Sequence, residues 1–254
     1  MHPELTEILK SFKPVTLSEM DDVKLLDRTD TKYVFSINKL PNILSNLTND
    51  YRILEVKGVN ENKYETLYFD TPDFKLYLDH HNGRINRYKV RFRKYVDSNL
   101  VFFEIKNKNN KGRTLKNRIK RNRMAETLEG KPIEFINEKA PLCPEGLESK
   151  LWVNYSRITF VNKVCAERLT IDLDLLLKMG EQVHTYENLV IAEVKQQNPA
   201  FSPFIKVMKT NHVRQGSISK YCFGVISLLP GIKKNNFKSS LIKMNALNAK
   251  TILN

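Results

Sequence analysis

Residues 87–95, with the sequence RYKVRFRKY, decide the fold. From Arg87 to Arg93, four cationic residues alternate with three apolar or aromatic ones. Because successive side chains of a β-strand point to opposite faces, this stretch predicts a strand with one cationic and one apolar face. One such strand is ordinary in an antiparallel sheet, which commonly buries one face and exposes the other. The prediction therefore depends on how often the pattern recurs.

The alternation recurs in at least six segments, which together predict a many-stranded antiparallel protein. The polar positions of the further segments are Arg28, Asp30 and Lys32; Glu104, Lys106 and Lys108; Lys116, Arg118 and Lys120; Arg157 and Thr159; Arg168, Thr170, Asp172 and Asp174; and Glu193 and Lys195. Apolar residues occupy most of the intervening positions.

The positive charge of the chain is concentrated in one window. The 254 residues carry a formal net charge of +14, and residues 84–123 hold 15 Lys or Arg against two acids, so that this window contributes 15 − 2 = +13. An excess of this size favours polyanionic partners such as phosphorylated metabolites, nucleic acid or an acidic membrane face.

Several other classes of protein are excluded or disfavoured. The longest uncharged apolar run near the end, residues 221–232, is shorter than the roughly 20 residues of a membrane helix. The acidic N-terminal sequence does not resemble a signal peptide. Cys143, Cys165 and Cys222 form neither a disulfide framework nor a C-x-x-C motif, which favours a reducing, cytoplasmic location. The phosphate-loop, G-x-G-x-x-G and H-E-x-x-H motifs are all missing from the sequence.

Helices are expected between and after the strands. The predicted ranges are 40–47, 125–128, 133–139, 145–150, 202–212, 217–229 and 238–253. The absence of repeats and of Gly/Ser linkers indicates one domain over residues 1–236. Residues 237–254 then form a basic amphipathic C-terminal helix or tail.

Two arrangements are compatible with strands that each carry one charged face. In a sandwich, the apolar faces meet in the core and the charged faces lie in solvent. In a barrel, the charged faces line the interior and helices cover the apolar outer face. Periodicity alone favours the sandwich, because burying charge is costly unless the charge is paired or bound to a ligand.

Three features favour the barrel instead. The polar faces carry arginines with matching carboxylates, the helices need an apolar surface to cover, and acids recur at fixed places in the basic pattern. A tunnel of this composition suits a phosphate chain with a divalent ion. Guanidinium groups bind phosphate oxygens in pairs, and carboxylates hold a hard cation that bridges phosphates.

Eight segments, in this order along the chain, resemble the vacuolar transporter chaperone (VTC) domain, a member of the triphosphate tunnel metalloenzyme (CYTH-like) superfamily, in its bacterial stand-alone form. They are RTDTKYVF, YETLYFDT, RYKVRFRKY, FFEIKNK, YSRITF, RLTIDLDL, IAEVKQ and SISKY, and they span about residues 25–229. The resemblance implies an α+β fold, an antiparallel eight-stranded tunnel barrel with a charged interior and helices packed outside. It also implies metal-dependent phosphoryl transfer on triphosphate or polyphosphate, because eukaryotic members resemble polyphosphate polymerases that take the terminal phosphate of ATP.

The resemblance also implies particular site residues. The phosphate-binding cations are Lys32, Lys89, Arg91, Arg93, Lys106, Arg157, Arg168 and Lys220, to which Lys195 is added because it lies two residues after Glu193. Glu193 is the expected ligand of Mn²⁺ or Mg²⁺, with Asp172 and Asp174 as helpers. For Arg157 and Arg168, a structural pairing with Asp172 or Asp174 is the alternative, and for Glu193 a salt bridge to the tunnel cations.

The sequence departs from the superfamily at two places. The first strand often carries Glu-x-Glu-x-Lys, whereas this chain has Arg28, Asp30 and Lys32, which leaves fewer carboxylates for a second metal ion. Ser217 stands where polymerase members can carry another lysine. A tunnel triphosphatase and a non-catalytic polyphosphate or nucleotide sensor therefore remain alternatives to a polymerase.

The remaining expectations concern partners. ATP, triphosphate or polyphosphate is the expected ligand, and nucleic acid is not expected because no RNP1-like run of aromatics accompanies the basic window. The C-terminal basic helix is a separate hypothesis for a membrane-surface or membrane-protein contact.

Overall fold

The alternating segments form the strands of one large sheet. A computed structural model describes residues 3–21, 29–197 and 201–249 of the chain. Among these residues the sheet follows the order β12-β2-β11-β9-β8-β4-β5-β6-β7, and every neighbouring pair on this path is antiparallel. The strands on this path are β2 (Thr29–Ser36), β4 (Glu61–Asp70), β5 (Arg87–Tyr95), β6 (Leu100–Lys108), β7 (Thr114–Arg121), β8 (Glu148–Asn162), β9 (Glu167–Met179), β11 (Leu189–Gln196) and β12 (Gln215–Gly216).

Three short strands extend the sheet beyond this path. They are β1 (Pro14–Val15), β3 (Tyr51–Leu54) and β10 (Gln182–Tyr186). The β3 strand pairs with β8 and with β1, and β10 pairs with β9. The antiparallel α+β architecture of the sequence-based prediction is thus confirmed. Within the described residues, however, the end strands β7 and β12 do not pair with each other, so the sheet is open along one side.

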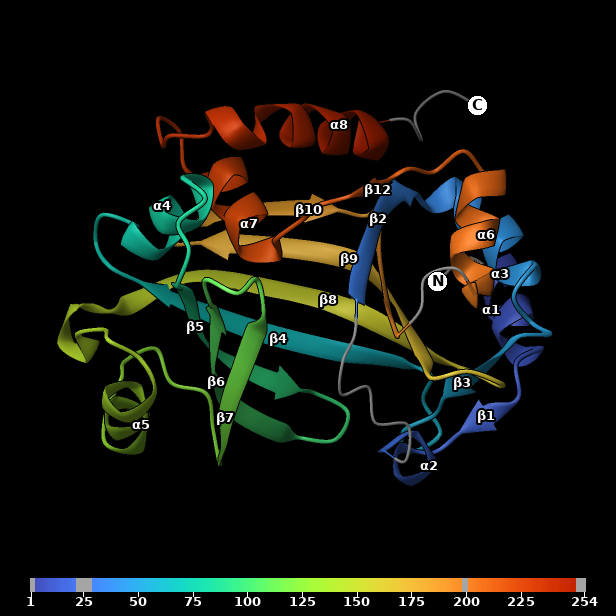
Figure 1. The fold of residues 1–254 in the computed structure, drawn as a ribbon, viewed down its shortest axis with the longest axis horizontal. Coiled ribbons are helices and arrows are strands. Elements are labelled where there is room, and N and C mark those ends of the chain that lie inside the picture. The colour runs from blue at the N-terminus through green and yellow to red at the C-terminus, as the bar shows by residue number, and fades with distance from the viewer. Residues whose placement is uncertain (1–2, 22–28, 198–200, 250–254) are drawn as a thin grey trace.

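The sheet is strongly curved, and its charged faces lie on the concave side. In Figure 1, β2 at one end and β5–β7 at the other run steeply across the direction of β4, β8 and β9. Lys89 on β5 donates a hydrogen bond at 2.8 Å to Ser219, which follows β12 by three residues, so the two ends of the sheet approach each other. We call this concave side, which carries Lys32, Lys89, Arg157 and Glu193, the inner face.

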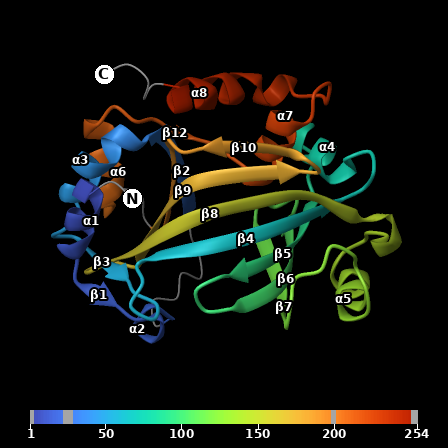
Figure 2. The same ribbon diagram turned by 180° about the vertical axis from the view of Figure 1, so that it is seen from behind.

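Helices cover the outer face, where the apolar residues that alternate with the charged ones along the strands lie. One cluster joins β2, β8, β9 and β11 to helices α1 (Pro3–Lys10), α3 (Leu40–Ser45) and α6 (Pro203–Thr210). A second joins the outer residues of β4, β5 and β6 to α5 (Lys131–Lys139). Figures 1 and 2 show the first three helices together at one end of the sheet and α5 at the other. Two short helices lie elsewhere: Met20 of α2 (Leu17–Asp21) packs against the small cluster of Val15, Leu54 and Val161, and Tyr77 of α4 (Lys75–His81) is buried in the cluster that contains α7 (Lys220–Leu228).

Helix α7 (Lys220–Leu228) lies on the inner face and closes one end of it. At this end of the strands the inner-face positions are apolar instead of charged. The buried side chains of α7 pack against them, among them Val34, Val153, Leu177 and Ile191. Tyr221 stacks on Tyr68 of β4 with ring centroids 4.9 Å apart. The concave side therefore has a charged part and an end that is filled with apolar side chains.

Helix α8 (Lys238–Ala249) lies across α7 (Figure 1). Its Met244 is buried in the same cluster as α7, and Phe237, Leu241 and Leu247 pack against that cluster. The apolar stripe of the predicted C-terminal helix is thus in contact with the body of the protein. None of the helices in the described ranges has the length and apolarity needed to cross a bilayer.

Two predicted helices are wrong. Residues 125–128 contain no helix. Residues 145–150 begin with a 3₁₀ turn, Pro144–Gly146, and continue into β8. Their polar composition resembles a helix surface, but Leu151 and Val153 downstream place the segment in a strand that pairs with β4.

Candidate functional site

The charged part of the inner face gathers side chains from β2, β4, β5, β6, β8, β9 and β11 and from the first turn of α7. Each strand contributes because its alternation places polar residues on this face. The predicted site residues that lie here are Lys32, Lys89, Arg91, Arg93, Lys106, Arg157, Asp172, Glu193, Lys195 and Lys220.

Asp172 on β9 is held by two cations. It accepts hydrogen bonds from Arg157 Nε at 2.5 Å and Nη2 at 2.8 Å, and Lys220 of α7 also donates to it. Burial raises the pKa of Asp172, but the charges of Arg157 and Lys220 outweigh burial and hold this pKa below its ordinary value. Because both carboxylate oxygens are engaged, the structural pairing considered for Arg157 is present.

Glu104 on β6 makes a second ion-paired group. Arg91 donates to Glu104 Oε2 from Nε at 2.8 Å and from Nη2 at 2.6 Å, and Lys116 of β7 pairs with Oε1. Arg91 Nη1 also donates to the Tyr68 hydroxyl at 2.9 Å. Both Arg91 and Glu104 are buried, with 5% and 0% of their surface exposed.

Glu193 on β11 forms the third group. Lys195 donates to Glu193 Oε1 at 2.8 Å and to Asp30 at 3.0 Å, and Lys32 lies 3.9 Å from the same Oε1. Burial raises the pKa of Glu193, but Lys195 and Lys32 outweigh it and keep the carboxylate ionised, with a pKa below its ordinary value. Glu193 Oε2 has no hydrogen bond to any described residue.

Three of the predicted phosphate-binding cations on the inner face lack an acidic partner among the described residues. Lys89 donates only to the Ser219 hydroxyl at 2.8 Å, and Arg93 makes one long bond to Thr66 at 3.3 Å. No described hydrogen bond or ion pair holds Lys106, and the charges of Arg91 and Arg93, with burial, lower its pKa well below the ordinary value. Arg93 is 8% exposed. Buried cations without counter-charges are costly unless an anion binds them.

Two stacked tyrosines lie under several of these cations. Tyr64 on β4 and Tyr155 on β8 are direct neighbours in register, with ring centroids 5.2 Å apart and planes inclined by 9°. The guanidinium groups of Arg93 and Arg157 lie over both rings, and Lys220 lies over Tyr155. We call this pair the tyrosine floor.

Comparison with known families gives the affiliation of the chain. The family model described as the VTC domain matches residues 27–229, which is most of the sequence. The chain belongs to the VTC domain family. No curated protein sequence matches it.

Two solved structures illustrate the resemblance of this VTC domain to other proteins. A proposed adenylate cyclase from Bacillus halodurans has 14% identity and a TM-score of 0.49, over 75% of this chain and 92% of that one. A proposed adenylyl cyclase from Hippeastrum with a dominant triphosphatase activity has 11% identity and a TM-score of 0.48, over 82% of this chain and 99% of that one.

Not every predicted site residue of this VTC domain lies in the charged part of the inner face. Asp174 is the extra residue of a bulge between β8 and β9, with φ of 52°, and its side chain is exposed. The bulge thus separates it from Asp172. Arg168, by contrast, stands opposite Lys195 in register on β9 and therefore shares its face, at the margin of the charged part. Arg28 lies outside the described residues.

Sequence reasoning missed several residues that complete the site. The tyrosine floor was overlooked, although Tyr155 precedes Arg157 by two residues and therefore shares its face. Lys116 stands in an alternating run but was not included among the candidate cations. Ser219 gave no signal, because its contact with Lys89 depends on how α7 packs against β5.

The first turn of α7 is held by Ser219. This residue caps the helix by accepting a hydrogen bond from the Cys222 N–H at 3.3 Å, and it also accepts from Lys89. The next residue, Lys220, reaches Asp172 on the other side of the inner face. Helix α7 thereby links β5 to β9 at the boundary of the charged part.

The described side chains supply only some of the ligands that a divalent ion needs. Within the described residues, no three Asp, Glu, His or Cys side chains cluster as a metal site would require. Glu193 remains an ionised carboxylate with one oxygen unengaged. Mg²⁺ is commonly held by one or two carboxylates together with substrate phosphates and water, and Glu193 fits that pattern.

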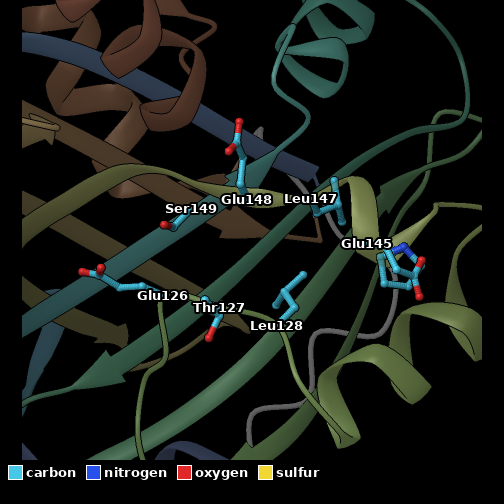
Figure 3. A pocket seen from close by; sticks show the side chains of 8 residues that line it. Glu126, Thr127, Leu128, Glu145, Leu147, Glu148 and Ser149 are labelled. Carbon is cyan, nitrogen blue, oxygen red and sulfur yellow. The ribbon is translucent and has the colours of Figure 1, made fainter.

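A pocket away from the inner face has the wrong charge for an anion. Figure 3 shows it between residues 126–128 and the start of β8, where Glu126, Glu145 and Glu148 surround it. The inner face, with its three cations that lack acidic partners, is therefore the candidate site for a polyanion.

Proposed function

We propose that this VTC domain binds the phosphate chain of ATP or polyphosphate on the inner face and acts as a polyphosphate polymerase. The single observation that carries the proposal is the set of cations without acidic partners, Lys89, Arg93 and Lys106, surrounded by three ion-paired groups. Membership of the VTC domain family supports triphosphate-related phosphoryl transfer as the reaction class.

The chemistry asks for positioning and charge neutralisation more than for covalent participation by the protein. A terminal oxygen of a phosphate chain attacks the γ-phosphorus of ATP, a new P–O–P bond forms, and the bond to the ADP oxygen breaks. The attacking oxygen is already ionised, so no general base is needed. Arg93 and Lys106 would orient the reacting phosphates and neutralise the charge on their oxygens.

A divalent ion fits this proposal through Glu193. When bound, Mn²⁺ or Mg²⁺ would supply Lewis-acid neutralisation of phosphate oxygens. The ionised Glu193 carboxylate would hold the ion on the inner face, with Lys195 and Lys32 keeping that carboxylate in place. Asp172 is less suited to this role because Arg157 and Lys220 occupy its oxygens.

A tunnel triphosphatase is the second candidate, and the closed end of the inner face favours it. Helix α7 and its apolar neighbours fill that end, so a long chain cannot pass straight through. A short triphosphate would fit such a site without needing an exit. Water would then replace the chain end as the attacking group.

The deciding experiment incubates the purified chain with ATP and Mn²⁺ or Mg²⁺ and separates the products. A polymerase yields ADP and acid-stable phosphate chains, whereas a triphosphatase yields only free phosphate. Arg93→Ala should lower the rate at least about 100-fold, because it removes a preorganised positive charge. Lys94→Ala, on the outer face of the same strand, is the matched control and should leave the rate unchanged.

Two other outcomes count against catalysis. Tight binding of tripolyphosphate without turnover in the presence of either metal would identify a sensor. Absence of both binding and turnover would contradict the assignment of the inner face as a phosphate site.

A further inference from the structure

The tyrosine floor serves several cations at once. Arg157 Cζ lies 5.1 Å from the ring centroid of Tyr64 and 5.2 Å from that of Tyr155. Arg93 Cζ lies 5.6 Å and 5.9 Å from the same two centroids, and Lys220 Nζ lies 4.6 Å from Tyr155. Three cations from β5, β8 and α7 therefore converge on two rings.

The register explains why they meet there. Tyr64 pairs with Tyr155, while Arg93 stands opposite Thr66, one inner-face position along β4, and Arg157 stands opposite Asn62, one position in the other direction. The two arginines thus flank the rings along the strand direction and lean over them. Like charges gathered in this way repel, and the negative faces of the rings offset part of that repulsion.

An aromatic ring holds a cation in a different way from a carboxylate. A carboxylate neutralises the cation and competes with an incoming phosphate for its N–H groups. A ring face attracts the cation but carries no net charge and accepts no strong hydrogen bond. Burial raises the pKa of Tyr64 to about 12, so its hydroxyl stays protonated and the ring stays neutral at physiological pH.

Arg93 depends on the floor most. Its only described hydrogen bond is the long one to Thr66, whereas Arg157 and Lys220 also contact Asp172. The rings are thus the main contact that fixes the guanidinium of Arg93. Fixing a flexible side chain before the ligand arrives reduces the entropy lost on binding.

We propose that Tyr64 and Tyr155 are positioning residues, which hold Arg93, Arg157 and Lys220 toward a bound phosphate chain while leaving Arg93 fully available to it. This inference rests on the proposed function in one respect only, namely that the ligand of the inner face is a phosphate chain.

The test measures the affinity of the full chain for tripolyphosphate by titration calorimetry. Tyr155→Phe keeps the ring and should bind within about twofold of the wild type. Replacing Tyr155 by mono-, di- and trifluorophenylalanine keeps the shape but weakens the negative ring face step by step. The affinity should fall with each fluorine, by about tenfold in total.

Tyr95 supplies the matched control. It lies in the same row, with its ring centroid 4.9 Å from that of Tyr64, and no cation of the described residues lies over it. The same fluorinated series at position 95 should leave the affinity unchanged. Because all these variants retain an aromatic side chain of similar size, circular dichroism should show the same fold throughout.

The outcomes separate the two proposals. Suppose that the wild type binds tripolyphosphate but that fluorination at position 155 leaves the affinity unchanged, or changes it only as fluorination at position 95 does. The positioning role is then overturned, and the phosphate site stands. If the wild type does not bind, the proposed function fails and this inference fails with it.

Discussion

Lys116 is an inner-face cation that changes its charge within one pH unit of physiological pH. Burial lowers its pKa to about 8, helped by the charges of Arg91 and Arg93 and opposed by Glu104. Lys116 is therefore positive below that pH and loses its charge as the pH rises through it. Tripolyphosphate affinity, measured by calorimetry, should consequently fall roughly fivefold more between pH 7 and pH 9 in the wild type than in Lys116→Arg.

The comparison with Lys116→Arg removes the effect of the ligand's own ionisation, since both proteins meet the same tripolyphosphate at each pH. Identical pH profiles for the two proteins would show that Lys116 does not contribute its charge to binding. Lys94→Arg, on the opposite face of β5, should retain the wild-type profile.

At the same scale, the sequence predicts which way a side chain faces better than what it touches. Alternation fixes the face of Arg91 and Arg157, because the period of a strand is two residues. The partner of Lys89 is Ser219, 130 positions away, and no local pattern encodes that contact. The catalytic roles assigned to these cations stay predictions.

At the scale of elements, the packing of α7 against β8 depends on a glycine. A Cβ atom on Gly224 would lie 2.5 Å from Leu151 Cδ2, and Leu151 is fully buried. Gly224→Ala should therefore lower the free energy of unfolding by about 1–3 kcal/mol, measured by urea denaturation. In a protein that already carries Leu151→Ala, the same Gly224→Ala substitution should cost less free energy of unfolding, because the clashing atoms of Leu151 are absent.

If the losses in free energy of unfolding caused by the two substitutions simply add up in the double variant, the close approach between α7 and β8 is contradicted. The position of the helix matters for the site, since its first turn carries Ser219 and Lys220.

Elements with strong alternation were predictable, whereas those set by distant partners were not. β5, β6 and β11 follow from their sequences alone, and α6 follows from Ser202 and Pro203 at its start. The start of β8 was predicted as a helix because residues 145–150 are polar, although pairing with β4 makes it a strand. The bulge at Asp174 shifts the register of β9, which no periodicity in the sequence indicates.

At the scale of the whole molecule, the inner face stores electrostatic repulsion that a polyanion should relieve. A ligand present at 100 times its dissociation constant stabilises the folded state by about 2.7 kcal/mol, or a rise in Tm of roughly 5–10 °C for a chain of this size. Tripolyphosphate should produce this shift in a thermal scan. The double variant Arg93→Ala, Lys106→Gln should lose most of it.

Sodium chloride at matched ionic strength is the control for general screening. A shift of equal size with sodium chloride, or an undiminished shift in the double variant, would place the stabilising anion elsewhere on the protein.

The blind end beneath α7 determines how such a protein would meet a polymer. Phosphate units on the charged part cannot continue past α7, but the side that β7 and β12 leave open among the described residues lets a chain leave sideways. The tip of a growing chain would then lie near α7 while the rest of the chain turned out through that side. Each extension would have to be followed by a retreat of the product by one unit in the same direction.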